Sequence, residues 1–278
     1  MKLALCNEVL RDLGFAAQCE LAASLGYDAV EVAPFTLSEA PHELTAGERH
    51  CLRRTAREAG VPVSGLHFLL IAPPGLTITG EDAEARARTQ SVIIELINLC
   101  ADLGGRYLVH GSPQQRSVLP GASMPAARAR ARDILVAAGE AAGRAGVVYC
   151  LEALAPQETN FINTVAEAAE LVREIGAPAL KTMIDTSAAG RAEAQPIEEL
   201  ARQWVPTGLI GHVHLNDRKR RGPGQGEDRF GDFLRALAET GYSGAAGVEP
   251  FDYHPDPRTC AARAIGYVRG IEEAMAHG

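Results

Sequence analysis

The sequence predicts a single closed (β/α)8 barrel domain that uses the whole chain, residues 1–278. Short apolar runs rich in Val, Ile and Leu alternate with longer amphipathic stretches rich in Ala, Arg and Glu, which is the pattern of parallel strands joined by crossover helices. The alternation occurs eight times, and such barrels typically need about 250 residues. No composition shift or linker suggests a second domain.

The predicted strands, in chain order, are residues 2–6, 29–32, 63–69, 107–110, 147–152, 180–185, 210–215 and 246–249. A helix is expected after each strand, the last from about residue 257 to residue 274. Several of these helices end at a glycine just before the next strand, as in SLGYDAVEV and DLGGRYLVH. Glycine adopts the left-handed conformation that ends a helix, so these positions support the assigned order of elements.

Composition excludes several classes of protein. Hydrophobic residues make up 46% and charged residues 22% of the chain, which favours a folded globular protein over a disordered one. The net charge of −8 disfavours binding to nucleic acid or to an anionic membrane. Six scattered cysteines without a C-x-x-C pair, and an N-terminus unlike a signal peptide, lead us to expect a cytoplasmic protein.

Polar residues end the last four predicted strands: Glu152, Asp185, His214 and Glu249, separated by 33, 29 and 35 residues. The carboxyl ends of the strands form the open mouth of such a barrel, where active sites lie. Any one of these residues alone could form a salt bridge or a helix cap. Buried carboxylates in register need a shared partner, so together they predict a site for one divalent metal ion.

Histidines near strand ends are further candidates. His212 and His214 point to the same side of their strand, and His214 is assigned as the ligand because it lies nearer the strand end. His212 is then expected to be a hydrogen-bonded structural residue. His67 and His110 end the third and fourth strands, so both are predicted to face the mouth, where they would contact substrate or hold a second metal.

Five motifs extend these observations: LEAL-x5-NFINT, MIDTS, GHVHLND, RGPGQG and VEPF. In order and spacing they resemble the xylose isomerase-like TIM barrel superfamily, in particular its sugar isomerase/epimerase branch of D-tagatose 3-epimerase and inosose dehydratase type. The resemblance implies that Glu158 and Arg220 contact substrate, and that Glu152 and Glu249 form a proton-exchanging pair. It also implies an enediolate intermediate formed beside a metal-bound carbonyl. Mn²⁺ is the expected ion, with Co²⁺, Mg²⁺ and Zn²⁺ as alternatives.

The expected substrate is a sugar or keto-sugar, with no nucleic-acid or membrane partner, and the family analogy leaves a homodimer or homotetramer open. One departure widens the choice of reaction, because Ala188 stands where the epimerases commonly carry a histidine. A dehydratase or lyase acting on a keto-sugar or inosose is therefore an alternative. An apurinic endonuclease-like phosphodiesterase is less favoured, since residues for its third metal are missing. A non-catalytic barrel that binds a metal-chelated sugar or a partner protein is the third class.

Overall fold

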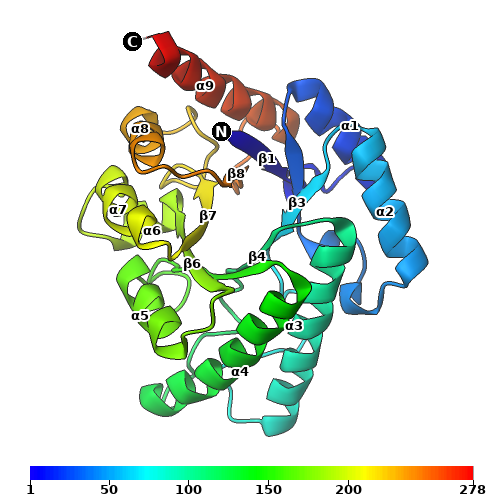
Figure 1. The fold of residues 1–278 in the computed structure, drawn as a ribbon, viewed down its shortest axis with the longest axis vertical. Coiled ribbons are helices and arrows are strands. Elements are labelled where there is room, and N and C mark those ends of the chain that lie inside the picture. Colours follow the sequence, from blue (N-terminus) through cyan, green and yellow to red (C-terminus); the bar gives the residue numbers. More distant parts are fainter. Residues whose placement is uncertain (278) are drawn as a thin grey trace.

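The computed structural model, which describes residues 1–277, is a closed barrel of parallel strands surrounded by helices (Figure 1). The strands follow chain order around the barrel, and β1 pairs in parallel with both β2 and β8. They are β1 (Lys2–Cys6), β2 (Ala29–Val32), β3 (Val63–Leu66), β4 (Tyr107–His110), β5 (Val148–Leu151), β6 (Leu180–Asp185), β7 (Ile210–Leu215) and β8 (Ala245–Val248). The predicted fold is confirmed.

The observed strands differ slightly from three of the predicted ones. β3 ends at Leu66 rather than at residue 69, because Phe68 has a φ of 52° and cannot continue an extended strand. β5 is shorter by one residue at each end, and β8 begins and ends one residue earlier than predicted. Glu152 and Glu249 therefore lie just past their strands, at the start of the loops that line the mouth.

The helices lie outside the strands, and several end at a glycine as the sequence predicts. They are α1 (Phe15–Leu25), α2 (Ala46–Glu58), α3 (Ala83–Leu103), α4 (Met124–Ala145), α5 (Val165–Ile175), α6 (Thr186–Ala192), α7 (Ile197–Trp204), α8 (Gly231–Glu239) and α9 (Pro257–His277). Gly26 and Gly104 end α1 and α3 in the left-handed conformation, with φ of 91° and 87°. Two helices, α6 and α7, follow β6, where one was expected.

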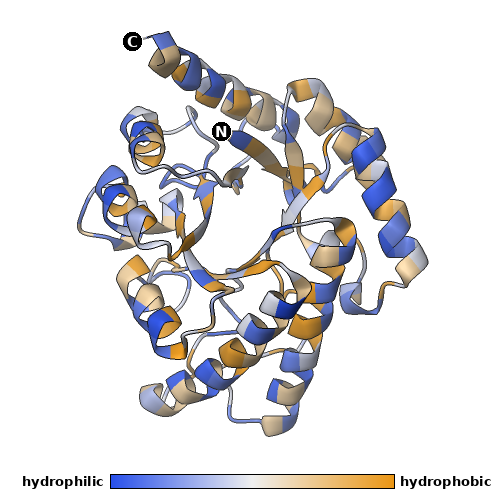
Figure 2. Cartoon of the chain, in the orientation of Figure 1, coloured by the Kyte–Doolittle hydropathy of each residue, from blue (hydrophilic) through white to orange (hydrophobic). Residues whose placement is uncertain are grey.

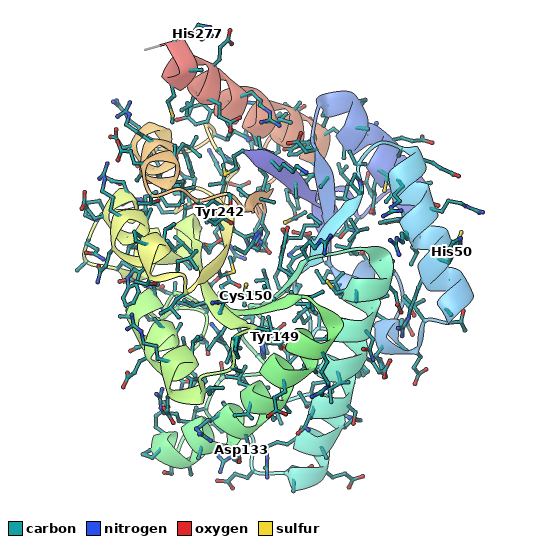
Figure 3. All side chains as sticks on the ribbon, viewed as in Figure 1. His50, Asp133, Tyr149, Cys150, Tyr242 and His277 are labelled. Carbon is teal, nitrogen blue, oxygen red and sulfur yellow. The ribbon has the colours of Figure 1, made fainter. Side chains whose placement is uncertain are left out.

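Apolar side chains fill two regions of the barrel. The larger cluster lies between the strands and the helices, and Figure 2 shows the strands coloured mainly as hydrophobic. A smaller cluster of Tyr107, Val109, Cys150 and Met183 comes from neighbouring strands. In Figure 3 Cys150 lies within the barrel, whereas Asp133 lies on an outer helix. No helix in residues 1–277 has the length and apolar character needed to cross a membrane.

Candidate metal centre and substrate pocket

The structure brings the four predicted metal ligands together at the carboxyl end of the barrel. Glu152 follows β5, Asp185 ends β6, His214 lies in β7 and Glu249 follows β8. Each offers one ligand atom, and these atoms all lie within 4.8 Å of one another. Strand register helps to align them, because Asp185 is the direct partner of His214 across the β6–β7 pair. All four side chains are buried.

The geometry at His214 fits a divalent cation. Its Nε2 lies within hydrogen-bonding distance of Glu31, 2.9 Å from Oε1. Its Nδ1 lies 3.0 Å from Glu249 Oε2, yet this buried nitrogen has no hydrogen-bond partner in the described residues. Two ligands at right angles, each about 2.1 Å from a common ion, are about 3.0 Å apart. The short contact is therefore the one expected between two ligands of one metal.

The charges of the three carboxylates also call for a cation. Burial, followed by the charges of Asp185 and Glu249, raises the pKa of Glu152 well above its usual value. Burial and then Glu249 raise the pKa of Asp185 to about 6. Burial acts in the same direction on Glu249, but His214 and His67 lower its pKa to about 2. A divalent ion would offset this repulsion and hold the carboxylates ionised.

Glu31 supports the centre from below, and the sequence reasoning missed it. This fully buried carboxylate on β2 lies 2.9 Å from His214 Nε2 and 3.0 Å from His212 Nε2, and it accepts a 2.8 Å hydrogen bond from the Tyr107 hydroxyl. Burial raises the pKa of Glu31, but His212 and His214 outweigh that effect and lower it well below its usual value. An ionised Glu31 keeps the proton of His214 on Nε2 and leaves Nδ1 for the metal.

His212 contributes to the same support and does not join the ligand cluster. Its ring stacks on Tyr107, with ring centroids 3.8 Å apart, one layer below His214. A charged residue between the valines of β2 was the available signal for Glu31. The sequence alone did not show that it faces the barrel interior, because strands covered by helices are buried on both faces.

The structure places His67 behind the metal ligands rather than in the pocket. It is fully buried, with Nδ1 hydrogen-bonded to Glu249 Oε1 at 2.8 Å and Nε2 2.9 Å from Glu8 Oε2. Burial lowers the pKa of His67, but Glu8 and Glu249 raise it to about 10. Cys6, Glu8, His67 and Glu249 form a second group of close donor atoms. Because His67 already bridges the two carboxylates, this arrangement favours positioning of Glu249 over substrate contact.

His110 is also absent from the pocket lining. Its Nδ1 lies 2.8 Å from the Tyr149 hydroxyl, and its side chain is fully buried. Burial, followed by the charge of Arg116, lowers the pKa of His110 to about 3, so the ring is neutral. Arg116 itself is fully buried and donates to the backbone oxygen of Glu152 at 2.6 Å, another contact that the sequence did not reveal.

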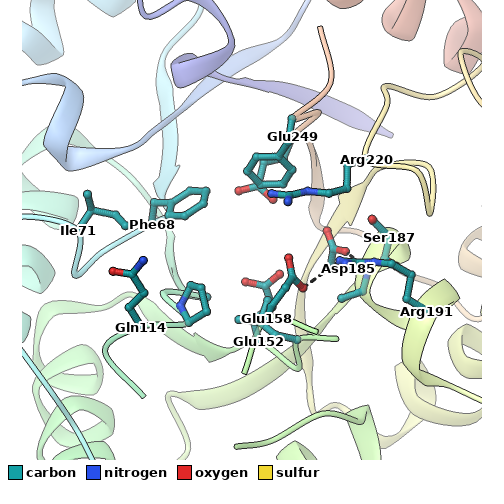
Figure 4. Close-up of a pocket in the computed structure, with 15 residues that line it drawn as sticks. Phe68, Ile71, Gln114, Glu152, Glu158, Asp185, Ser187, Arg191, Arg220 and Glu249 are labelled. Atoms are coloured by element: carbon teal, nitrogen blue, oxygen red, sulfur yellow. Dashed lines mark hydrogen bonds and ion pairs between the residues drawn. The ribbon is translucent and has the colours of Figure 1, made fainter. Parts of the chain in front are cut away.

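Above the metal ligands lies an open pocket of about 980 Å³, solvent at its mouth included (Figure 4). Glu158 and Arg220, the predicted substrate contacts, both line it. The Arg220 guanidinium stacks on Phe251, with Cζ 4.3 Å from the ring centroid. On another wall, Arg191 Nη2 donates to Glu158 Oε2 at 2.9 Å. Arg191 was not among the predicted site residues.

Gly111 lies where the pocket meets the predicted metal ligands. It follows β4 and lines the pocket, and a Cβ atom at this position would overlap with Glu152 Oε2. Ala188, where the resemblance to the epimerases leads us to expect a histidine, contributes only a methyl group to the pocket wall. The pocket therefore has more room at position 188 than the sequence resemblance implies.

Comparison with known proteins gives consistent matches. The family described as xylose isomerase-like TIM barrel matches residues 19–271. D-psicose 3-epimerase of Agrobacterium fabrum is 27% identical over 245 residues, which cover 85% of this chain and 79% of that protein. Among solved structures, D-psicose 3-epimerase in the presence of D-fructose has a TM-score of 0.83 and 22% identity, covering 98% and 99% of the two chains. The 3-keto-D-glucoside 4-epimerase from E. coli also has a TM-score of 0.83, with 21% identity over 97% and 99%. At these identities the structural matches establish the fold.

Proposed function

Because this chain belongs to the xylose isomerase-like TIM barrel family, we propose that it is a divalent-metal-dependent epimerase or isomerase of a sugar or keto-sugar. The observation that carries the proposal is the placement of Glu152 and Glu249. They enter the pocket from opposite walls and share one cluster of metal-ligand atoms with Asp185 and His214 (Figure 4). The similarity to D-psicose 3-epimerase of Agrobacterium fabrum supports the same class of reaction.

The two glutamates would move the proton. Glu152, Asp185, His214 and Glu249 would hold a divalent ion, which would polarise a substrate carbonyl and so acidify the adjacent C–H bond. One carboxylate then removes that proton to give an enediolate, and the other returns a proton from the opposite face. Two bases on opposite walls are what inversion at one carbon requires. His67 and Glu31 hold Glu249 and His214 in place during these steps.

The formal charges of the site favour an uncharged substrate. Three ligand carboxylates and Glu158 bring four negative charges, and a divalent ion with Arg191 and Arg220 brings four positive charges. A site that is neutral overall gains little by binding a phosphate or carboxylate group. We therefore expect an unphosphorylated sugar. Mn²⁺ is the proposed ion, because carboxylate oxygens with one imidazole suit it, and Co²⁺, Mg²⁺ and Zn²⁺ remain alternatives.

Solvent deuterium exchange tests the proposal directly. Ketoses, keto-inositols and 3-keto-sugars would each be incubated in D₂O with Mn²⁺-loaded protein, metal-stripped protein, Glu152→Gln or Glu249→Gln. We expect label on one carbon of one substrate class only with metal, and interconversion of the two epimers only when both glutamates are present. Glu20→Gln is the matched control, because Glu20 is exposed on α1. Exchange that persists without metal, or no exchange with any sugar, would refute the proposal. A product lighter by one water would identify a dehydratase instead.

A further inference from the structure

We propose that Arg191 is a specificity-determining residue that, together with Glu158, binds one hydroxyl group of an uncharged sugar. The inference rests on the proposed function, because it assigns a role to a second wall of the same pocket. Glu158 was predicted to contact substrate, but nothing in the sequence motifs pointed to Arg191. The assignment comes from the placement of its guanidinium group.

Arg191 reaches the pocket from the last turn of α6. Its side chain is 21% exposed, its Nε donates to the backbone oxygen of Ser187 at 3.2 Å, and its Nη2 donates to Glu158 Oε2 at 2.9 Å. Figure 4 shows the side chain directed from α6 toward Glu158. Ala188 lies three residues earlier, on the same face of the helix, and lines the pocket beside it. A larger residue at position 188 would occupy the space next to the guanidinium.

Arg191 and Glu158 together offer a hydrogen-bond donor and a hydrogen-bond acceptor to the same hydroxyl group of a substrate. Within the described residues Glu158 Oε2 accepts hydrogen bonds from Arg191 and from the Ala155 amide at 3.2 Å, whereas Oε1 accepts none. The guanidinium keeps further N–H donors after its two hydrogen bonds. A sugar hydroxyl donates and accepts at the same time. It would therefore satisfy the free carboxylate oxygen and a free guanidinium donor together.

Ser187 gives a second, independent indication of a ligand at this wall. Its side chain is only 2% exposed and lines the pocket, and its hydroxyl has no hydrogen-bond partner in the described residues. Buried hydroxyl groups are nearly always hydrogen-bonded, to protein, to water or to a ligand. Ser187 Oγ therefore needs a partner other than the described side chains, such as a water molecule or a polar group of the substrate.

Charge defines the class of substituent that the pair accepts. Arg191 and Glu158 are half-buried partners of opposite charge, so together they are neutral. A phosphate or carboxylate substituent would be attracted by the guanidinium but repelled by Glu158 at nearly the same distance. A neutral hydroxyl meets no such repulsion. The pair therefore selects an uncharged sugar over its phosphorylated or carboxylated counterpart.

Steady-state kinetics on the sugar that wild-type protein labels in D₂O would test the assignment. The variants are Arg191→Ala, Arg191→Lys and the control Arg202→Ala, which removes an exposed arginine of α7 that pairs with Glu199. Each is compared on the sugar and on monodeoxy analogues that lack one hydroxyl away from the reacting carbons. Thermal melting establishes whether each variant is folded. If Arg191→Ala is not folded, Arg191→Lys provides the test.

We expect Arg191→Ala to raise KM about ten- to hundredfold, with a smaller change in kcat, because a hydrogen bond to a charged group is lost. Arg191→Lys should recover part of the loss, since it keeps the charge without the planar fork. With wild-type protein, one monodeoxy analogue should have a KM raised by the same factor, relative to the sugar. For that analogue, Arg191→Ala should have the same KM as wild-type protein, because the hydroxyl that Arg191 binds is already missing.

Two results overturn the assignment while leaving the proposed function intact. One is a KM for folded Arg191 variants within about threefold of wild type. The other is an equal rise in KM for the sugar and every deoxy analogue, which would mean that Arg191 acts only through packing. If wild-type protein labels no sugar at all, the proposed function fails and the assignment fails with it.

Discussion

Replacing Glu31 by glutamine should weaken metal binding although Glu31 is not itself a ligand. The carboxylate has contacts from three donor groups, with His214 on Oε1 and with His212 and Tyr107 on Oε2. A glutamine side chain has only one acceptor oxygen, so its NH₂ group must face at least one of these donors. If it faces His214, the imidazole is driven toward the tautomer that carries its proton on Nδ1, the nitrogen assigned to the metal.

The expected loss of metal affinity in Glu31→Gln follows from what residues that orient a metal ligand contribute to metal binding. Loss of a residue that orients a metal-bound histidine typically lowers metal affinity about 10- to 100-fold, which corresponds to about 1.4–2.7 kcal/mol. Tyr107→Phe should have a smaller effect, because both histidine contacts with Glu31 remain. Glu20→Gln on the exposed face of α1 should have none.

Calorimetric titration of Mn²⁺ into metal-free protein measures these affinities, and circular dichroism checks that each variant is folded. A folded Glu31→Gln protein that binds Mn²⁺ within about twofold of wild type would show that Glu31 does not set the state of His214. An equal loss in Tyr107→Phe would instead attribute the effect to packing around the buried carboxylate.

Three further predictions concern the same region. Gly111→Ala should lower kcat/KM more than about 100-fold while the protein stays folded, because the added Cβ overlaps Glu152 Oε2; activity close to wild type would contradict this. Mn²⁺ at about 100 times its Kd should raise the free energy of unfolding by about 2.7 kcal/mol, and this gain should vanish in Asp185→Asn; an equal gain in that variant would place the ion elsewhere. The pKa of His110 is about 3 in the folded protein because of burial and Arg116, and about 6.5 when unfolded. The unfolded state therefore takes up the proton first as the pH falls, and stability decreases between about pH 6.5 and pH 3. Urea unfolding at several pH values should show a shallower decrease for His110→Gln, and an unchanged slope would exclude this histidine as its source.

Local patterns in the sequence predicted the barrel and the four polar residues that the structure brings together at its mouth. Parallel strands covered on both faces are continuous apolar runs, and a polar residue at the end of such a run stands out, as Asp185 does in LKTMID. Glycines such as Gly26 marked where helices end. Regular spacing of the strands placed the ligands in one ring, because each βα unit advances the chain by one strand.

Contacts across the barrel could not be predicted in the same way. Glu31 and His214 are 183 residues apart in sequence, and His67 connects Glu8 with Glu249, which are also far apart in sequence. Whether Glu31 faces the interior depends on the tilt and register of the closed sheet, which a strand of four residues does not specify. Arg191 lines the pocket because the short helix α6 follows β6 directly. The sequence did not predict α6 as a separate element, so Arg191 was not recognised as a site residue.

The contact between Glu31 on β2 and His214 on β7 has a consequence for how the protein folds. The predicted metal ligands lie at the ends of β5 to β8, but Glu31 lies on β2, and Glu8 and His67 follow β1 and β3. An intermediate in which the first strands have not yet joined the last would hold four loosely oriented ligands and bind the ion weakly. Metal binding should therefore favour the joined ring over its open precursors, and its onset during refolding would mark the moment at which β1 closes against β8.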